Sequence, residues 1–450
     1  LAATHFEKVS VQEQDISLQA RALWGLAQCY LFTGQTTQAK DSMQKALRIL
    51  KNEDIRARVQ YRLALEDSSK GIHDAAILGF QNVRTNALRG ISADLLNAAR
   101  FMQFKNMLTA KNIVGGEALL AEMRAQPDAS YLDMALLTMA QARIDRGDYR
   151  VAKSVLFEFG EQTPASKLQA VAVLEEIRLL VIKRKWTEVI ASYDQWLEDY
   201  PRHQKRTEVI FDRAWALAQS GQADGAVKSF KRLIKDSPDI QQAYMAKMWL
   251  ADRAYNSRTN QLSAEKWYKE IRGATNCPPS LRHRAGMMAG RAAMERQGFD
   301  DARNAFTILI DDDQVRKKNP RIHVEASFAL GDLTMIELGG AAQDQIEKLT
   351  QSTNAFYSII QVNPTNAVAA RAWGRIGDCC LRVSGDQPGY QVYAKTAYEM
   401  SLAVTGPVPV NVRSQAHIGL AYALERQAGG QEGGKKLQES VDHLLAVFFG

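Results

Sequence analysis

Histidine, cysteine and acidic side chains build most catalytic and metal-binding sites, and their spacing in this chain forms none of the familiar motifs. The sequence has seven histidines and four cysteines in 450 residues. No histidine belongs to an H-E-x-x-H sequence or accompanies a C-x-x-C pair, which are spacings typical of zinc sites. The G-x-S-x-G nucleophile elbow of many hydrolases is missing as well. We therefore expect no catalytic residue, no metal ion and no cofactor in this chain, and we interpret it as non-enzymatic.

Two segments come close to a ligand-binding motif. Residues 429–435 read G-x4-G-K, but Lys436 follows where a P-loop has the Ser or Thr that contacts magnesium, and no strand precedes the segment. The run Asp311-Asp312-Asp313 lacks the spacing and the glycine of an EF-hand loop. We interpret the first as a flexible glycine turn. The second is expected to be a solvated turn beyond a helix, because acidic charge is unfavourable at a helix C-terminus.

The composition is that of an ordinary folded protein and excludes several classes. Hydrophobic residues make up 46% and charged residues 24%, so wholesale disorder is excluded. The net charge of +7 is modest for this length, and the basic clusters at 183–185, 202–206 and 316–318 are short. Nucleic-acid binding needs a concentrated basic face, so no nucleic-acid partner is expected. No apolar run approaches the roughly 18 residues of a membrane-spanning helix.

The elements that organise the chain are visible as a repeat. Large residues recur at steps of 37 to 39 residues, at Phe6, Met43, Phe80, Leu119, Leu156, Tyr193, Phe230, Tyr268 and Phe306. Alanine stands four residues before several of them, at Ala2, Ala39, Ala76, Ala152, Ala226, Ala264 and Ala302. Glycine stands five residues before four of those alanines, at Gly34, Gly71, Gly147 and Gly221. Proline recurs every 37 residues at Pro127, Pro164, Pro201 and Pro238.

This pattern predicts a hairpin of two helices, which we call helix A and helix B. Alanine and a large residue at i and i+4 share one helix face, so they place the buried side of helix B. Glycine before helix B suits a tight turn that needs a positive φ, and proline after it ends the unit. A single hairpin cannot bury its apolar face alone, so the hairpins must stack on one another.

These residues resemble the tetratricopeptide repeat, whose signature is W-x2-L-G-x2-Y, then A-x3-F, then P. Trp373, Ile376 and Gly377 match its first part, with Cys380 in the tyrosine position. Two further matches are the set Leu23, Leu26, Ala27, Tyr30, Gly34, Ala39, Met43 and Ala46, and the set Gly290, Ala302 and Phe306. The resemblance implies an all-α solenoid of about ten to eleven hairpins, wound into a right-handed superhelix, that binds other proteins.

One subgroup of the family is more similar than the rest. The repeat here is longer than the usual ~34 residues. The unit from Asp199-Tyr200-Pro201 through Ala226 and Phe230 to Ser237-Pro238 is similar to repeats of the outer-membrane-protein assembly lipoprotein and of the Tol–Pal coordinator of bacterial envelopes. The resemblance implies a scaffold in a cell-envelope complex, in the periplasm or at the outer membrane, with protein subunits as partners. The alternative is a cytoplasmic adaptor or regulator whose signalling or catalytic domain lies outside this segment.

The rhythm divides the chain into two parts. Residues 1–310 form a regular array, and residues 311–450 carry longer loops inside the repeats, at 338–346, 384–391 and 427–436. Such insertions often map to a binding face, but surface loops also lengthen at little entropic cost. The chain starts as a helix B without its helix A and ends on an apolar stretch. We therefore expect one continuous solenoid that is part of a longer chain, or whose ends dock on partners.

Two sets of side chains are candidates for partner binding. In the family, the second, fifth and ninth positions of helix A face inward, and aromatic and arginine side chains favour interface hot spots. This register selects Arg178, Trp215, Trp249, Arg253 and Arg291, although apolar fifth-position residues could instead pack between A helices. The C-terminal set is Leu444, Leu445, Val447, Phe448 and Phe449, which surround most of a helix. We expect further chain or a partner to cover it; a frayed terminus is the alternative.

Overall fold

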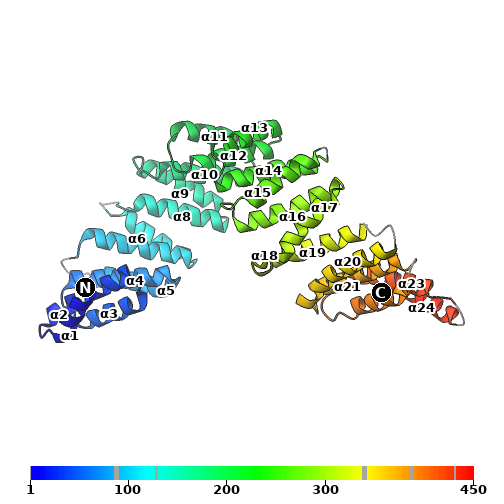
Figure 1. Ribbon diagram of the computed structural model, residues 1–450. Helices are drawn as coiled ribbons and strands as arrows, with labels where there is room; N and C mark the ends of the chain where they lie inside the picture. The colour runs from blue at the N-terminus through cyan, green and yellow to red at the C-terminus, as the bar shows by residue number, and fades with distance from the viewer. Residues whose placement is uncertain are drawn as a thin grey trace. The chain divides into compact units, whose positions relative to one another are not determined.

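The computed structural model describes residues 2–85, 91–126, 130–258, 260–336, 342–385, 389–429 and 432–449, with the side chains of 342–345 and Phe449 left out. These residues form 24 helices and no strand (Figure 1). The all-α prediction is confirmed. Pro127 lies outside the described residues, as do parts of the three long loops predicted at 338–346, 384–391 and 427–436.

The helices fall into two compact units, residues 1–206 and 207–450. The first contains α1 (Ala2–Gln12), α2 (Ile16–Phe32), α3 (Thr36–Ile49), α4 (Glu53–Ser69), α5 (His73–Thr85), α6 (Ala93–Thr109), α7 (Ile113–Arg124), α8 (Leu132–Arg146), α9 (Tyr149–Gln162), α10 (Gln169–Ile182) and α11 (Trp186–Asp199). The second contains α12 (Arg206–Gln219), α13 (Ala223–Asp236), α14 (Gln241–Asn256), α15 (Gln261–Gly273), α16 (Pro279–Glu295), α17 (Phe299–Asp311), α18 (Asp313–Lys318), α19 (Pro320–Ile336), α20 (Ala342–Val362), α21 (Ala367–Val383), α22 (Tyr390–Leu402), α23 (Val410–Arg426) and α24 (Gly433–Phe449).

Within each unit the helices pair as the repeat predicts. Helix A and helix B of one repeat pack together, as α2 does with α3 and α21 with α22, and each helix B packs on the next helix A, as α22 does on α23 (Figure 1). Eleven such hairpins are present in the part that the structure describes, five in the first unit and six in the second. The predicted number of hairpins is confirmed. The initial α1 is a lone helix B, as expected, and α18 is an extra short helix.

The alanine and the large residue of helix B occupy the core in the paired repeats, but in the lone α1 the prediction is wrong, since Ala2 and Phe6 are exposed. Ala39, Ala76, Ala226 and Ala302 have no exposed surface, and the rings of Phe80, Phe230, Phe306 and Phe356 are likewise fully buried. For Phe306 and Phe356, a glycine of helix A explains how the ring fits. A Cβ built on Gly331 would overlap the ring of Phe356, so the absence of a side chain there lets α20 approach α19 closely.

The turn between helix A and helix B needs a left-handed residue in eight repeats. Glycine supplies it at Gly34, Gly71, Gly147 and Gly221, with φ between 74° and 89°. The predicted role of these glycines is confirmed. In four other repeats the same position carries a side chain: Lys111 (φ 61°), Arg184 (φ 56°), Arg258 (φ 55°) and Gln297 (φ 63°). A left-handed residue with a Cβ costs roughly 1–2 kcal/mol, so these four turns carry strain that the glycine turns avoid.

The acidic run differs from the prediction of a turn beyond the helix. Asp311 is the last residue of α17, and Asp313 is the first of α18. Asp312 caps α18, because its carboxylate accepts a hydrogen bond from the backbone N–H of Gln314 at 2.8 Å. An ionised side chain at this position satisfies an N–H that the helix leaves free and is favoured by the helix dipole. The acidic run therefore starts a second helix rather than forming a turn.

Candidate functional site

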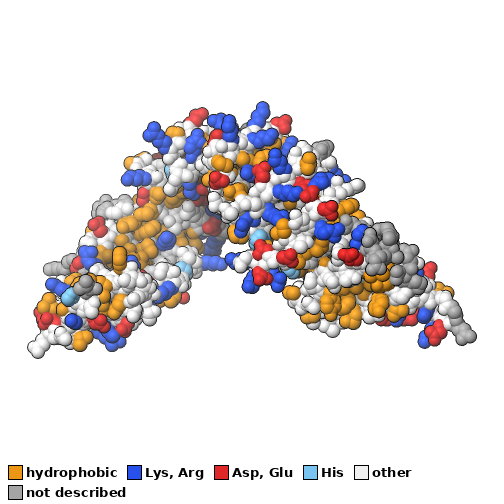
Figure 2. All heavy atoms as spheres, in the orientation of Figure 1, with side chains coloured by type: hydrophobic (Ala, Val, Ile, Leu, Met, Phe, Trp, Pro, Cys, Tyr) orange, Lys and Arg blue, Asp and Glu red, His pale blue; other side chains and the backbone are white. Residues whose placement is uncertain are grey.

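A groove of about 870 Å³ crosses the A helices of three consecutive repeats in the second unit. Its walls come from α19, α21 and α23, and the residues that define it include Val324, Glu325, Phe328, Val368, Arg371, Gly374, Arg375, Asp378, Val412, Gln415, Ile418 and Tyr422. We call it the α21 groove. Hydrophobic side chains gather at the surface nearby, over α20 and α21 in Figure 2.

Local sequence determines which side of α21 faces this groove. Ala369, Ala370 and Ala372 are fully buried, and small side chains of this kind let neighbouring helices approach closely. Asn366 fixes the start of the helix, since its side chain accepts hydrogen bonds from the backbone N–H groups of Val368 and Ala369 at 3.0 and 3.2 Å. The longer side chains Arg371, Arg375 and Asp378 then line the groove, with Ala370 at its floor.

One arginine of the groove is held by carboxylates. Arg375 lies 3.1 Å from Asp332 and 3.3 Å from Asp378. The contact between Arg375 and Asp332 Oδ1 lacks hydrogen-bond geometry. Asp332 Oδ1 therefore has no hydrogen-bond donor among the described residues. Burial raises the pKa of Asp332, and Arg375 opposes the rise. Asp378 also accepts a hydrogen bond of 2.7 Å from the Tyr398 hydroxyl, whose pKa is raised by burial and by this carboxylate.

The second arginine is placed differently. The Arg371 guanidinium carbon lies 4.6 Å from the centre of the Phe328 ring, a cation–π contact. The side chain is exposed, and the described part of the chain places no carboxylate in an ion pair with it. Tyr422, 55% exposed, supplies apolar surface on α23. Arg371 also helps Arg375 to oppose the rise in the pKa of Asp332. The groove thus offers an exposed cation that forms no ion pair within the described residues, held on an aromatic ring beside apolar surface.

Trp249 and Arg253 are the two predicted residues that the structure brings together. They line a second groove, of about 860 Å³, formed by α13, α14 and α15. The Trp249 ring packs 4.9 Å from the ring of Phe230, and Arg253 lies 5.9 Å above Trp249. Arg253 is also 3.9 Å from the exposed Asp224. Lys231 and Trp267 complete the side of this groove that is rich in cations and aromatic rings.

The other predicted A-helix residues line neither groove, although Arg291 contacts a residue of the α21 groove. Arg178, in the first unit, pairs with Asp145 at 2.7 Å and with Glu175 at 3.4 Å. Arg291 lies 3.4 Å from Glu325 on the neighbouring helix A. Trp215 is 37% exposed on α12. Both arginines therefore connect elements of the chain itself, and their role in partner binding stays a prediction.

The sequence analysis did not select Arg371, although the repeat register of its helix indicates it. The match of Trp373, Ile376 and Gly377 to the repeat signature fixes the register of α21 and puts Arg371 at the second position of helix A. The predicted candidates come from the fifth and ninth positions only. Four apolar fifth-position residues, Leu137, Phe211, Met287 and Phe328, are buried, which fits packing between A helices.

The predicted C-terminal set lies on α24. Leu444 is 38% exposed, Leu445 47% and Phe448 80%, while Val447 is half-buried and the Phe449 side chain lies outside the described residues. Leu437 and Val441 extend the same stripe toward the start of the helix. The opposite side of α24 packs on α23, where the Nδ1 atoms of His417 and His443 are 3.0 Å apart. Burial, His443 and Arg413 lower the pKa of His417.

The described residues contain neither a metal-binding cluster nor a membrane-spanning helix. No three histidine, cysteine, aspartate or glutamate side chains come together in a way that could hold a metal ion. No helix there combines the length and the apolar character needed to cross a membrane.

Comparison with known proteins identifies the repeat. Tetratricopeptide repeat models match residues 20–51, 211–279 and 287–339, so the chain carries tetratricopeptide repeats. No curated protein matches the sequence. None of these family matches indicates an enzyme.

Three solved structures are similar at 14% identity. A tetratricopeptide repeat protein from Parabacteroides merdae aligns over 65% of this chain and 98% of its own, with a TM-score of 0.35. A chain of the Naa15/Naa10 structure bound to HypK-THB aligns over 97% of this chain and 64% of its own, with a TM-score of 0.34. Yeast Tom70 aligns over 97% of this chain and 95% of its own, also with a TM-score of 0.34.

Proposed function

We propose that this chain is a non-catalytic protein-interaction scaffold that binds an extended segment of a partner protein in the α21 groove. The observation that carries the proposal is the exposed Arg371, which stacks on Phe328 and forms no ion pair with any carboxylate of the described residues. A cation held over an aromatic ring is pre-organised to receive an acidic group, so little side-chain entropy is lost on binding.

The size of the groove supports a short peptide segment. Three A helices packed side by side at 8–10 Å span about 20 Å. An extended chain advances about 3.3 Å per residue, so about six residues would cross the groove. The partner would place an acidic side chain on Arg371 and an apolar side chain against Tyr422. Arg375 is already paired with Asp332 and Asp378, so it would shape the wall of the groove rather than attract the acidic side chain.

A photo-crosslinking amino acid placed at Gln415 in the full chain tests the site. Partners crosslinked from Gln415 should be lost when Arg371 is changed to Glu and kept when Arg382 is changed to Glu. Arg382 is the matched control, since it is an exposed arginine of the same helix that does not line the groove. The same label at Tyr393, on the surface of α22, should capture different proteins. Equal capture by the two charge-reversed variants would refute the groove as the binding site.

The finer role that we propose is a structural or assembly component of a bacterial cell-envelope complex, with other subunits as partners, in the periplasm or at the outer membrane. The similarity of the unit 199–238 to repeats of envelope scaffolds supports it. We also propose that residues 1–310 and 311–450 belong to one continuous solenoid. Fractionation of cells that express the full-length protein tests the location. Recovery with cytoplasmic proteins would favour the alternative, a cytoplasmic adaptor or regulator.

A further inference from the structure

A third groove, of about 590 Å³, lies on helix B of a repeat in the first unit. Tyr149, Arg150, Lys153, Ser154 and Phe157 of α9 line it together with Lys183, which follows α10. We call it the α9 groove. It contains none of the predicted partner-binding residues and belongs to a different unit from the α21 groove.

The charge of the α9 groove is entirely positive. Arg150, Lys153 and Lys183 line it, and no acidic side chain does. In the part of the chain that is described, none of these three cations forms an ion pair. Burial raises the pKa of Glu176, and the charge of Lys153 opposes the rise. Three cations around one concavity favour an anionic ligand.

Aromatic rings supply the apolar part of the same surface. Phe157 is 69% exposed, and Tyr149 is 37% exposed. They are eight residues apart on α9, which is about 12 Å along the helix axis. An extended peptide covers that distance with about four residues. The two rings therefore bracket a length suited to a short segment, with the cations between and beside them.

The turn next to this groove carries basic side chains on a strained backbone. Arg184 has φ 56° at the position where four other repeats have glycine, and Lys183 and Lys185 flank it. Lys185 is paired with Glu188 at 2.7 Å. Strained backbone at a side-chain-bearing residue often marks a functional position, because glycine would relieve the strain.

We propose that the α9 groove binds a short acidic segment of a protein that carries an aromatic or large apolar residue between its carboxylates. The carboxylates meet Arg150, Lys153 and Lys183, and the apolar residue packs between Tyr149 and Phe157. A nucleic acid would need cations along an extended track, and a membrane surface would need a protruding apolar face. A concavity with three cations fits a peptide side chain better than either. This inference is independent of the α21 groove.

The test uses a labelled five-residue peptide with phenylalanine between two pairs of glutamates. Its binding is measured by fluorescence anisotropy to the chain that carries Arg371→Glu, so that the α21 groove does not contribute. Lys153→Glu and Lys183→Glu should each weaken binding about tenfold, and salt should weaken it further. Lys105→Glu is the matched control, since it reverses an exposed lysine of α6 in the same unit, and it should leave the affinity within about twofold.

Two further variants separate recognition from folding. Arg184→Gly removes a cation and relieves the left-handed strain, so a loss of affinity in this variant has no explanation in unfolding. We expect it to bind about threefold more weakly. Phe157→Ser should weaken the binding that remains at high salt. A peptide with glutamines in place of the glutamates should bind at least about tenfold more weakly than the acidic one.

Three results would overturn the proposal. The first is equal binding of the acidic and the glutamine peptides. The second is an equal loss of affinity in Lys105→Glu and Lys153→Glu, which would indicate a nonspecific charge effect. The third is tighter binding of a single-stranded DNA oligomer, or of vesicles that contain phosphatidylglycerol, with displacement of the peptide. That result would assign the groove to a nucleic acid or to a membrane surface instead.

Discussion

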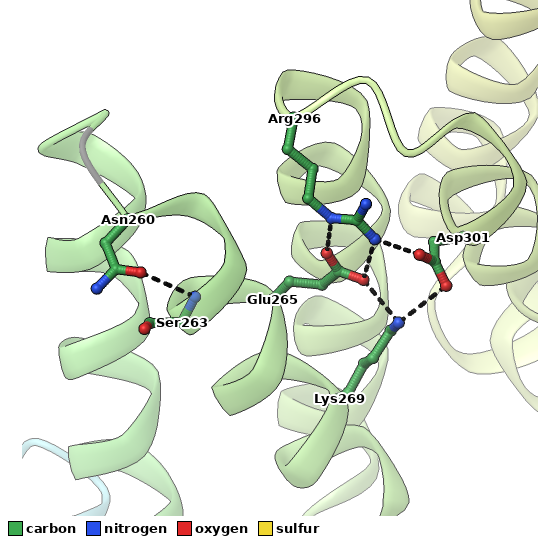
Figure 3. Close-up of polar contacts among 6 residues, drawn as sticks. All are labelled: Asn260, Ser263, Glu265, Lys269, Arg296 and Asp301. Carbon is green, nitrogen blue, oxygen red and sulfur yellow. Dashed lines mark hydrogen bonds and ion pairs between the residues drawn. The ribbon is translucent and has the colours of Figure 1, made fainter.

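Arg296 donates hydrogen bonds to both carboxylate oxygens of Glu265, from Nε over 2.5 Å and from Nη2 over 3.2 Å. Glu265 lies on α15 with its side chain 2% exposed, and Arg296 follows α16. Lys269 and Asp301 extend the contact into a ring of alternating charges that reaches α17 (Figure 3). Asn260 caps the start of α15 in the same view, by accepting a hydrogen bond from the N–H of Ser263.

We expect Glu265→Ala to lower the free energy of unfolding of the second unit by about 3 kcal/mol, since removing one partner leaves Arg296 and Lys269 without their shared carboxylate. Urea denaturation followed by circular dichroism measures the change. The double variant Glu265→Leu with Arg296→Met should recover most of the stability, because a buried ion pair is often replaceable by apolar side chains. If the double variant is less stable than Glu265→Ala alone, the network has a role beyond the pair.

Histidines should make the second unit less stable in mild acid. Burial lowers the pKa of His283, of His323 and of His417, and His417 is further affected by His443 and Arg413. The unfolded chain binds protons on these residues near pH 6.5, before the folded chain does, so the free energy of unfolding should fall as the pH drops from about 7 toward 5. His417→Gln should flatten this dependence in thermal melts recorded across the range. An unchanged slope would contradict the assignment to His417.

The left-handed turns predict gains in stability. Lys111→Gly and Gln297→Gly should each raise the free energy of unfolding by about 0.5–1 kcal/mol, as the relief of steric strain exceeds the entropy that glycine adds to the unfolded chain. Chemical denaturation of the two variants measures the effect. Gly221→Ala should destabilise by about 1 kcal/mol for the opposite reason. Ala110→Gly, next to Lys111 but with φ −74°, is the control and should not stabilise.

The exposed stripe on α24 predicts self-association of the isolated chain. Leu444, Leu445 and Phe448 leave apolar surface in water, and a contiguous patch of this kind is usually covered. The chain should form larger species in sedimentation at high concentration. A variant with Phe448 and Phe449 changed to Ser should do so less. If both remain equally monodisperse monomers, the expectation that this end is covered is wrong.

Sequence periodicity predicted the parts of the fold that repeat. The i, i+4 pair of Ala226 and Phe230 placed a buried face, and Gly221 placed a left-handed turn, because each follows from a rule that acts within a few residues. The short α18 lies between two repeats, outside the periodic pattern, and was not predicted. Its local signals are Asp312 as a helix cap and the basic residues 316–318 in its last turn, and both also fit a solvated turn.

The candidate site was less predictable for a physical reason. Register along helix A selects residues that face inward, but it does not show which of them already have a partner. Arg178 and Arg291 satisfy the register, yet Asp145 and Glu325 reach them from neighbouring A helices. Arg371 satisfies it too and has Phe328 beneath it instead of a carboxylate. Only the packing of adjacent repeats shows which of these arginines is paired with a carboxylate and which is not.

The contacts between helices have a consequence for how the chain folds. Helices touch their immediate successors or the corresponding helix of the adjacent repeat, so contacting residues are close in sequence. Low contact order of this kind favours rapid folding, and formation can start at any repeat and spread to its neighbours. The same property makes damage local. A destabilised hairpin loses protection of its amide protons against exchange together with the hairpins on either side, while distant hairpins keep theirs.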